Sequence, residues 1–145
     1  MKTLNDYINE CYINEKLKLS DINRDNIDGR WVDANKLKEK DLEEGNIVLL
    51  ENGNYYILAK DYIAGKLVKD KYLFKDDYLL IRKNEDNLYG YSFINFTTGY
   101  KNFLFHDRHT TFNIVKVYQR KRNYKNTKEL KDDLDLLYDG YLVKL

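Results

Sequence analysis

The sequence predicts an α+β, mainly β protein: a small SH3-like or related antiparallel barrel with an N-terminal amphipathic helix and a C-terminal helix. Residues 41–60 carry a hairpin pattern, and further short β-type runs separated by turn residues follow up to residue 118. Helical periodicity marks both ends of the chain. At 145 residues one core is expected, so we divide the chain into an N-terminal helix and polar tether (1–29) and a barrel domain with the C-terminal helix (30–145).

Residues 1–19 have the period of an amphipathic helix. One apolar stripe contains residues at positions i, i+3, i+4, i+7 and i+8, namely Leu4, Tyr7, Ile8, Cys11 and Tyr12. An isolated helix of this length is marginal in water, so the stripe must dock either on its own barrel or in a groove of another protein. We name these five residues as candidate partner contacts. The polar stretch that follows, up to residue 29, reads as a linker.

The hairpin is the clearest local signal. Residues 46–50 form a short apolar run, and residues 54–58 form a return run rich in Tyr and Ile. Asn52-Gly53 between them predicts a type I′ turn, because both residue types tolerate positive φ. Trp31, the single Trp, is expected in the core of the barrel.

The remaining strands are read from short β-rich runs between polar loops. We expect strands at residues 46–51, 54–60, 77–83, 88–96, 100–105 and 111–118. Hairpin loops are expected at residues 84–87 and 97–99. In the run 88–96, Tyr89, Tyr91 and Phe93 alternate with small residues, which predicts one aromatic face in core or half-core packing, in preference to a binding surface.

Two segments outside these strands have patterns of their own. Residues 61–76 fit either a hairpin turning at Ala64-Gly65 or a short helix, and we favour the hairpin. Near the C-terminus, Asn126 and Glu129 form a capping box, and Gly140 is placed to end the helix. The apolar stripe of that helix consists of Leu130, Leu134, Leu137 and Tyr138.

The charge and cysteine content limits the classes of function. The chain has 25 Lys and Arg against 24 Asp and Glu, a net charge of +1, which argues against a dedicated nucleic-acid binder. Cys11 is the single cysteine, so no intrachain disulfide forms and a reducing compartment is expected. No apolar run reaches the roughly 18–20 residues that span a bilayer, so we expect no membrane partner.

Chemistry-bearing residues are sparse. His106, Asp107, Arg108 and His109 form the one cluster with catalytic residue types, but a zinc site needs three or four protein ligands. Cys11 lies on an apolar stripe, and neither a G-x-S-x-G motif nor a Gly-rich phosphate loop is present. We therefore expect no enzyme, no cofactor, no metal and no catalytic residues.

A basic run offers an alternative function. Arg120, Lys121, Arg122, Tyr124 and Lys125 combine cations with a ring and could bind a nucleic acid. The same run could instead be a solvated connector paired with the acidic helix after it. The near-zero net charge favours the connector.

Two sequence patterns resemble proteins of tailed phages. The opening MKTLNDYINE, continued by INEKLKL, resembles N-terminal segments of such proteins, notably in the crAss-like group. EEGNIVLLENGNYYIL and the strand NIVKVYQ (113–119) resemble small phage barrel proteins, and together the patterns cover about a third of the chain. The resemblance implies a non-enzymatic virion component, such as an auxiliary capsid, connector or packaged protein, anchored through its N-terminal helix.

The partners implied by this resemblance are other phage structural proteins or further copies of the chain, with assembly in the host cytoplasm and residence in the virion. The same features fit two other functions: a nucleic-acid-binding accessory module and an inhibitor of a host protein.

Overall fold

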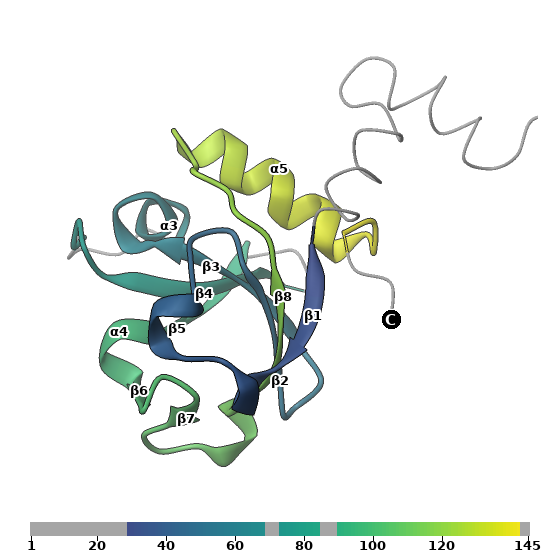
Figure 1. Ribbon diagram of the computed structural model, residues 1–145. Coiled ribbons are helices and arrows are strands. Elements are labelled where there is room, and N and C mark those ends of the chain that lie inside the picture. Colours follow the sequence, from purple (N-terminus) through teal and green to yellow (C-terminus); the bar gives the residue numbers. More distant parts are fainter. Residues whose placement is uncertain (1–28, 69–72, 85–89, 143–145) are drawn as a thin grey trace, which may run out of the picture.

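The computed structural model describes residues 29–68, 73–84 and 90–142 (Figure 1). Its main element is a six-stranded antiparallel sheet with the order β1-β8-β2-β3-β4-β5. These strands are β1 (Arg30–Asp33), β2 (Ile47–Leu50), β3 (Tyr55–Lys60), β4 (Tyr78–Lys83), β5 (Tyr91–Asn95) and β8 (Ile114–Gln119). A second, two-stranded sheet consists of β6 (Tyr100–Lys101) and β7 (Phe105–His106).

Three α-helices and three short 3-10 turns complete the described chain. The helices are α3 (Asp61–Val68), α4 (Phe96–Gly99) and α5 (Thr127–Tyr138). The 3-10 turns are η2 (Ala34–Lys36), η3 (Glu39–Asp41) and η4 (Thr110–Phe112). The predicted α+β class with a mainly antiparallel sheet is thereby confirmed, whereas the predicted helix and tether at residues 1–28 lie outside the described residues.

The main sheet is buried on both faces. Successive side chains of a strand point to opposite faces, and Ile47, Ile57 and Ile81 face one another across three strands. That face packs under α3 and α5, which lie together on one side of the sheet in Figure 1. The opposite face packs against Phe96 of α4 and Leu104 of the β6–β7 loop. The molecule therefore has two hydrophobic cores separated by one sheet.

The sheet has two edges. Within the described residues β1 pairs only with β8 and β5 pairs only with β4, so no ladder joins β1 to β5. The closed SH3-like barrel expected from the sequence is therefore not confirmed. A register shift between Leu49 and Leu50 bends β2 where it pairs with β8.

The first hairpin forms where it was predicted, but its turn is of another type. Gly53 has φ of 88°, whereas Asn52 is not among the positive-φ residues of the described chain, so the type I′ prediction is wrong. Asn52 uses its side chain to accept the N–H of Asn54 at 2.9 Å, and its own N–H bonds the carbonyl of Thr111 at 2.9 Å. These bonds hold Asn52 out of the left-handed region.

The hairpin predicted for residues 61–76 is wrong, because Asp61–Val68 forms helix α3. Ile63 and Ala64 are buried against the sheet and α5. A Cβ added at Gly65 would lie 2.2 Å from a methyl carbon of Leu73. Glycine therefore serves close packing here, where the sequence suggested a turn.

Residues 96–105 also differ from their predicted structure. A helical turn, α4, replaces the predicted loop at 97–99, because Phe96 is drawn into the core. The predicted strand 100–105 is split into β6 and β7 by Asn102 and Phe103, whose φ angles are 48° and 51°. This tight reversal buries Leu104.

The C-terminal helix forms where it was predicted, but only half of the predicted capping box is present: the Glu129 carboxylate accepts the N–H of Lys125 at 3.4 Å and not that of Asn126. The side chain of Asn126 accepts the N–H of Glu129 at 3.0 Å, which caps the first turn of α5. Gly140 has φ of 81°, and the N–H of Tyr141 bonds the carbonyl of Leu136 at 2.9 Å, as in a Schellman end. Trp31 is half-buried, with its ring 5.2 Å from that of Tyr118.

Candidate interaction site

Two of the five candidate nucleic-acid residues lie inside the protein. Arg120 is 6% exposed and Tyr124 is 9% exposed. A guanidinium N–H of Arg120 lies 2.6 Å from the Oδ2 of Asp133 on α5, and the Tyr124 hydroxyl donates to the same oxygen at 2.5 Å. Arg120 Nε also donates to the carbonyl of Gly45 at 2.8 Å. Arg120 and Tyr124 of the basic run are thus paired with the acidic helix, in a buried cluster that is not solvated.

The cluster continues into the turn that precedes β2. The carboxylate of Glu44 accepts the backbone N–H groups of Lys60 at 3.1 Å and Tyr124 at 3.2 Å. The side chain of Asn46 donates to the carbonyl of Arg120 at 2.6 Å. We call Glu44, Asn46, Arg120, Tyr124 and Asp133 the polar cluster. It joins the turn before β2, the segment after β8 and α5, so these polar residues have a structural role.

The surroundings of Tyr124 favour its neutral phenol. Burial raises the pKa of Tyr124 well above 10, and the negative charge of Asp133 raises it further. The remaining members of the basic run stay at the surface: Lys121 and Lys125 are exposed, and Arg122 is partly exposed.

The two histidines form part of an aromatic cluster. His106 stacks on His109 at 5.6 Å between ring centroids and meets Phe112 edge-on at 5.1 Å. Its Nδ1 accepts the backbone N–H groups of Arg108 at 3.1 Å and His109 at 3.0 Å, so that lone pair is already used. Burial, followed by the charge of His109, lowers the pKa of His106. This arrangement stabilises the turn before η4 and favours a neutral imidazole.

No group of three or more His, Cys, Asp or Glu side chains in residues 29–68, 73–84 and 90–142 is arranged to hold a metal ion. The His106 and His109 pair therefore gains no third ligand from this part of the chain.

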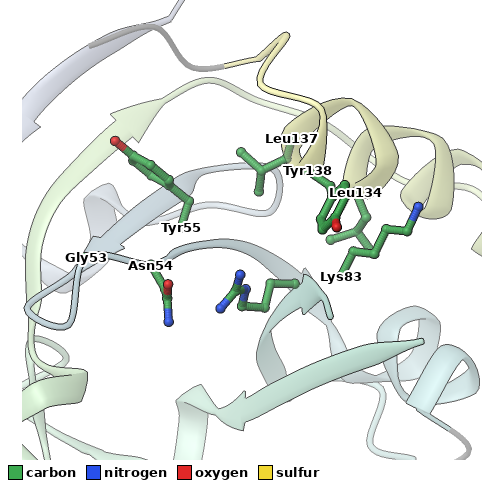
Figure 2. A pocket seen from close by; sticks show the side chains of 8 residues that line it. Gly53, Asn54, Tyr55, Lys83, Leu134, Leu137 and Tyr138 are labelled. Carbon is green, nitrogen blue, oxygen red and sulfur yellow. The ribbon is translucent and has the colours of Figure 1, made fainter. Parts of the chain in front are cut away.

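An open cleft of about 500 Å³ lies between the β2–β3 turn, the end of β4 and α5 (Figure 2). Figure 2 shows Tyr55 on one side and Leu134, Leu137 and Tyr138 of α5 on the other. Tyr138, predicted on the apolar stripe, is 43% exposed. Lys83 in this cleft is paired with Asp135 at 3.2 Å and lies 4.9 Å from the centre of the Tyr138 ring. The cleft therefore presents rings and aliphatic groups beside two cations, Arg82 and Lys83, and Lys83 is paired with an acidic residue.

The edge strand β5 has different properties. Its sequence, Tyr91–Asn95, contains no charged residue, and Phe93 at its centre is 43% exposed. Phe74 is 53% exposed and lines a small cleft with Asn95 at the end of the same strand. Edge strands usually carry charges or other devices that prevent pairing, and β5 has an exposed ring instead. We call β5 with Phe74 the aromatic edge.

The sequence did not identify the aromatic edge as a site. The alternation in residues 88–96 predicted core or half-core packing. Tyr91 is indeed half-buried, but Phe93 is substantially exposed. The sequence does show that this strand lacks charged residues, which could have indicated the site. That the strand lies at an edge of the sheet is shown only by the strand order. The predicted partner contacts Leu4, Tyr7, Ile8, Cys11 and Tyr12 lie outside the described residues.

No protein-family model, no curated protein and no solved structure matches this chain. Among the described residues no helix combines the length and hydrophobicity needed to cross a membrane.

Proposed function

We propose that this chain is a non-enzymatic interaction protein that binds another protein by strand addition at β5. The observation that carries the proposal is the aromatic edge: an uncharged outermost strand with Phe93 exposed at its centre. In strand addition, main-chain hydrogen bonds supply affinity and alternate side chains supply specificity. Phe93 is placed to supply that specificity.

The distribution of polar residues supports this proposal. Five buried polar or charged residues have hydrogen bonds within the fold: Glu44, Asn46, Asp61, Arg120 and Asp133. The polar cluster therefore contributes to the stability of the fold, because its hydrogen bonds are made within the protein. The surface features that remain, the aromatic edge and the cleft beside α5, suit a protein partner.

The biological setting is proposed from the resemblance to tailed-phage proteins. We take the partner to be part of a virion, with the N-terminal stripe of Leu4, Tyr7, Ile8, Cys11 and Tyr12 as an anchor and the sheet as the body. We further propose that the sheet is an opened relative of the predicted SH3-like barrel. Support comes from β8, the last strand of the sheet in sequence, which returns to lie between β1 and β2.

Counting the protein in density-purified phage particles by mass spectrometry tests this function. The wild type and Val115→Lys should be present at equal copy number, because Val115 is similarly exposed, at 42%, but lies on the interior strand β8. Phe93→Lys should be depleted from particles while remaining folded by circular dichroism. Absence of the wild type from particles would overturn the virion setting, and undiminished Phe93→Lys would overturn binding at the edge.

A truncation lacking residues 1–19 tests the anchor in the same assay. We expect the sheet domain to stay folded and to be lost from particles. An unfolded truncated protein would place the N-terminal segment in the core and contradict the anchor.

A further inference from the structure

Building on the proposed strand addition, we infer that β5 binds the β5 strand of a second copy of this chain, in antiparallel orientation about a twofold axis. The strand has five residues, and Phe93 is the third. Antiparallel pairing with itself therefore places Phe93 opposite its counterpart and Tyr91 opposite Asn95 of the partner copy. This arrangement is closed, because each copy uses the same patch.

The backbone of β5 is oriented for this pairing. The N–H of Asn84 donates to the carbonyl of Gly90 at 2.8 Å, so this facing pair is of the hydrogen-bonded kind. Facing pairs alternate in type along an antiparallel ladder, and Ile81 faces Phe93 three pairs further on. Phe93 and Tyr91 consequently direct both their N–H and C=O groups away from β4. Asn95 offers only its N–H, because it is the N-cap of α4 and its carbonyl accepts the first bond of that helix. Self-pairing at these positions would form about four interstrand hydrogen bonds.

Charge separates this partner from the other available strand. The opposite edge of the sheet, β1, carries Arg30 and Asp33 at its two ends. Charged residues on edge strands oppose pairing, and β5 has none. Joining β5 to β1 of another copy would also leave both outer edges open and generate a filament. The uncharged and self-complementary strand favours a closed pair.

The contact should be weak. Burying an aromatic side chain completely removes about 150–250 Å² of surface, and Phe93 and Phe74 are about half exposed, so together they add about 200 Å² per copy. With a five-residue strand, the patch stays below the roughly 800 Å² per partner of a stable interface. We expect a dissociation constant on the order of tens of micromolar. On a particle that holds many copies, high local concentration would populate such a contact.

Sedimentation equilibrium of the full-length protein tests the inference. From about 1 to 500 μM, a range that spans the expected dissociation constant, wild type and Val115→Lys should pass from monomer to dimer. In Phe93→Lys two cations would face each other at the centre of the pair. Their repulsion should raise the dissociation constant of the dimer at least about tenfold. A monomeric wild type, an unaffected Phe93→Lys dimer, or open polymers in place of dimers would each overturn self-pairing.

Cysteine cross-linking tests the register directly. In a hydrogen-bonded pair the facing Cα atoms lie about 5.5 Å apart, within the range that a disulfide bridges. Under mild oxidation, Phe93→Cys should give a dimer whose disulfide joins position 93 to position 93, identified by peptide mass spectrometry. Val115→Cys and the wild type, which carries Cys11 alone, are the controls. A 93-to-93 yield no higher than the control cross-links would contradict the predicted register.

The two proposals fail in different ways. If the wild type stays monomeric while its particle association still requires Phe93, β5 pairs with another protein: the self-pairing inference is then wrong and strand addition stands. If both self-association and particle association are insensitive to Phe93→Lys, both proposals fail.

Discussion

Replacing Asp133 with Ala should severely destabilise the protein, because its carboxylate is the acceptor that holds Arg120 inside. The Arg120 side chain is 2% exposed and that of Asp133 is 12% exposed, with 2.6 Å between their charged atoms. Removing one partner of such a pair leaves an uncompensated buried charge, which typically costs about 3–5 kcal/mol. The hydroxyl of Tyr124 loses the same acceptor, which places the expected loss toward the upper end.

A neighbouring residue provides a matched control. Asp132 is also on α5 and pairs with Lys128 at 3.8 Å, but both side chains are exposed, at 55% and 85%. Asp132→Ala makes the same chemical change on the same helix and should alter the unfolding free energy by less than about 0.5–1 kcal/mol. The difference between the two variants therefore isolates the buried pair from the helix propensity of Ala.

Urea denaturation followed by circular dichroism measures both variants. A loss of about 3–5 kcal/mol in Asp133→Ala corresponds to a fall in Tm of about 10–15 °C for a domain of this size. A loss no larger than that of Asp132→Ala would refute the reasoning. In the described chain Arg120 Nη1 has no hydrogen-bond partner, so the pair is imperfectly satisfied. The triple variant Arg120→Met, Tyr124→Phe, Asp133→Leu should therefore recover most of the lost stability.

Three more predictions follow from other positions. Gly45→Ala should cost about 2–3 kcal/mol more than Gly53→Ala in urea denaturation, since both have positive φ but an added Cβ lies 2.5 Å from the nitrogen of Arg122 only at Gly45; equal costs would contradict it. The imidazole of His106 should titrate below pH 6.5 by NMR, so its contribution to stability is full above pH 6.5 and is lost as the pH falls through the lowered pKa; a midpoint above 6.5 would show that the charged ring is favoured. Above pH 10 the unfolded chain releases the phenol proton that native Tyr124 retains, so stability should fall as the pH rises, and less steeply in Tyr124→Phe; identical alkaline slopes would be evidence against the raised pKa.

Local sequence signals predicted the elements whose ends are determined by residues close to them in the sequence. Asn126 and Gly140 defined the ends of α5 because capping depends on residues within a few positions of the helix terminus. The strands β2, β3 and β4 were predicted to within one residue or so, because β-rich runs are bounded there by turn residues.

Elements decided by distant contacts were not predicted. A glycine such as Gly65 is compatible both with a turn and with a tightly packed helix. Only the contact with Leu73, which the local sequence does not show, distinguishes the two structures. Arg120 and Tyr124 resembled surface binding residues because their acceptor, Asp133, is encoded on the next helix. The exposure of Phe93 depends on which strand lies outermost, which local periodicity does not contain.

The place of β8 in the sheet also determines when the sheet can be completed during synthesis. Strand β1 pairs only with β8 in the described chain, and Arg30 contacts Gln119 across 89 positions of sequence. On the ribosome, β2 to β5 can pair with their neighbours as they emerge, but β1 has no partner until Ile114–Gln119 has been made. A chain released early would expose the unpaired edge of β2 alongside that of β5, so truncated products should aggregate more readily than the finished protein.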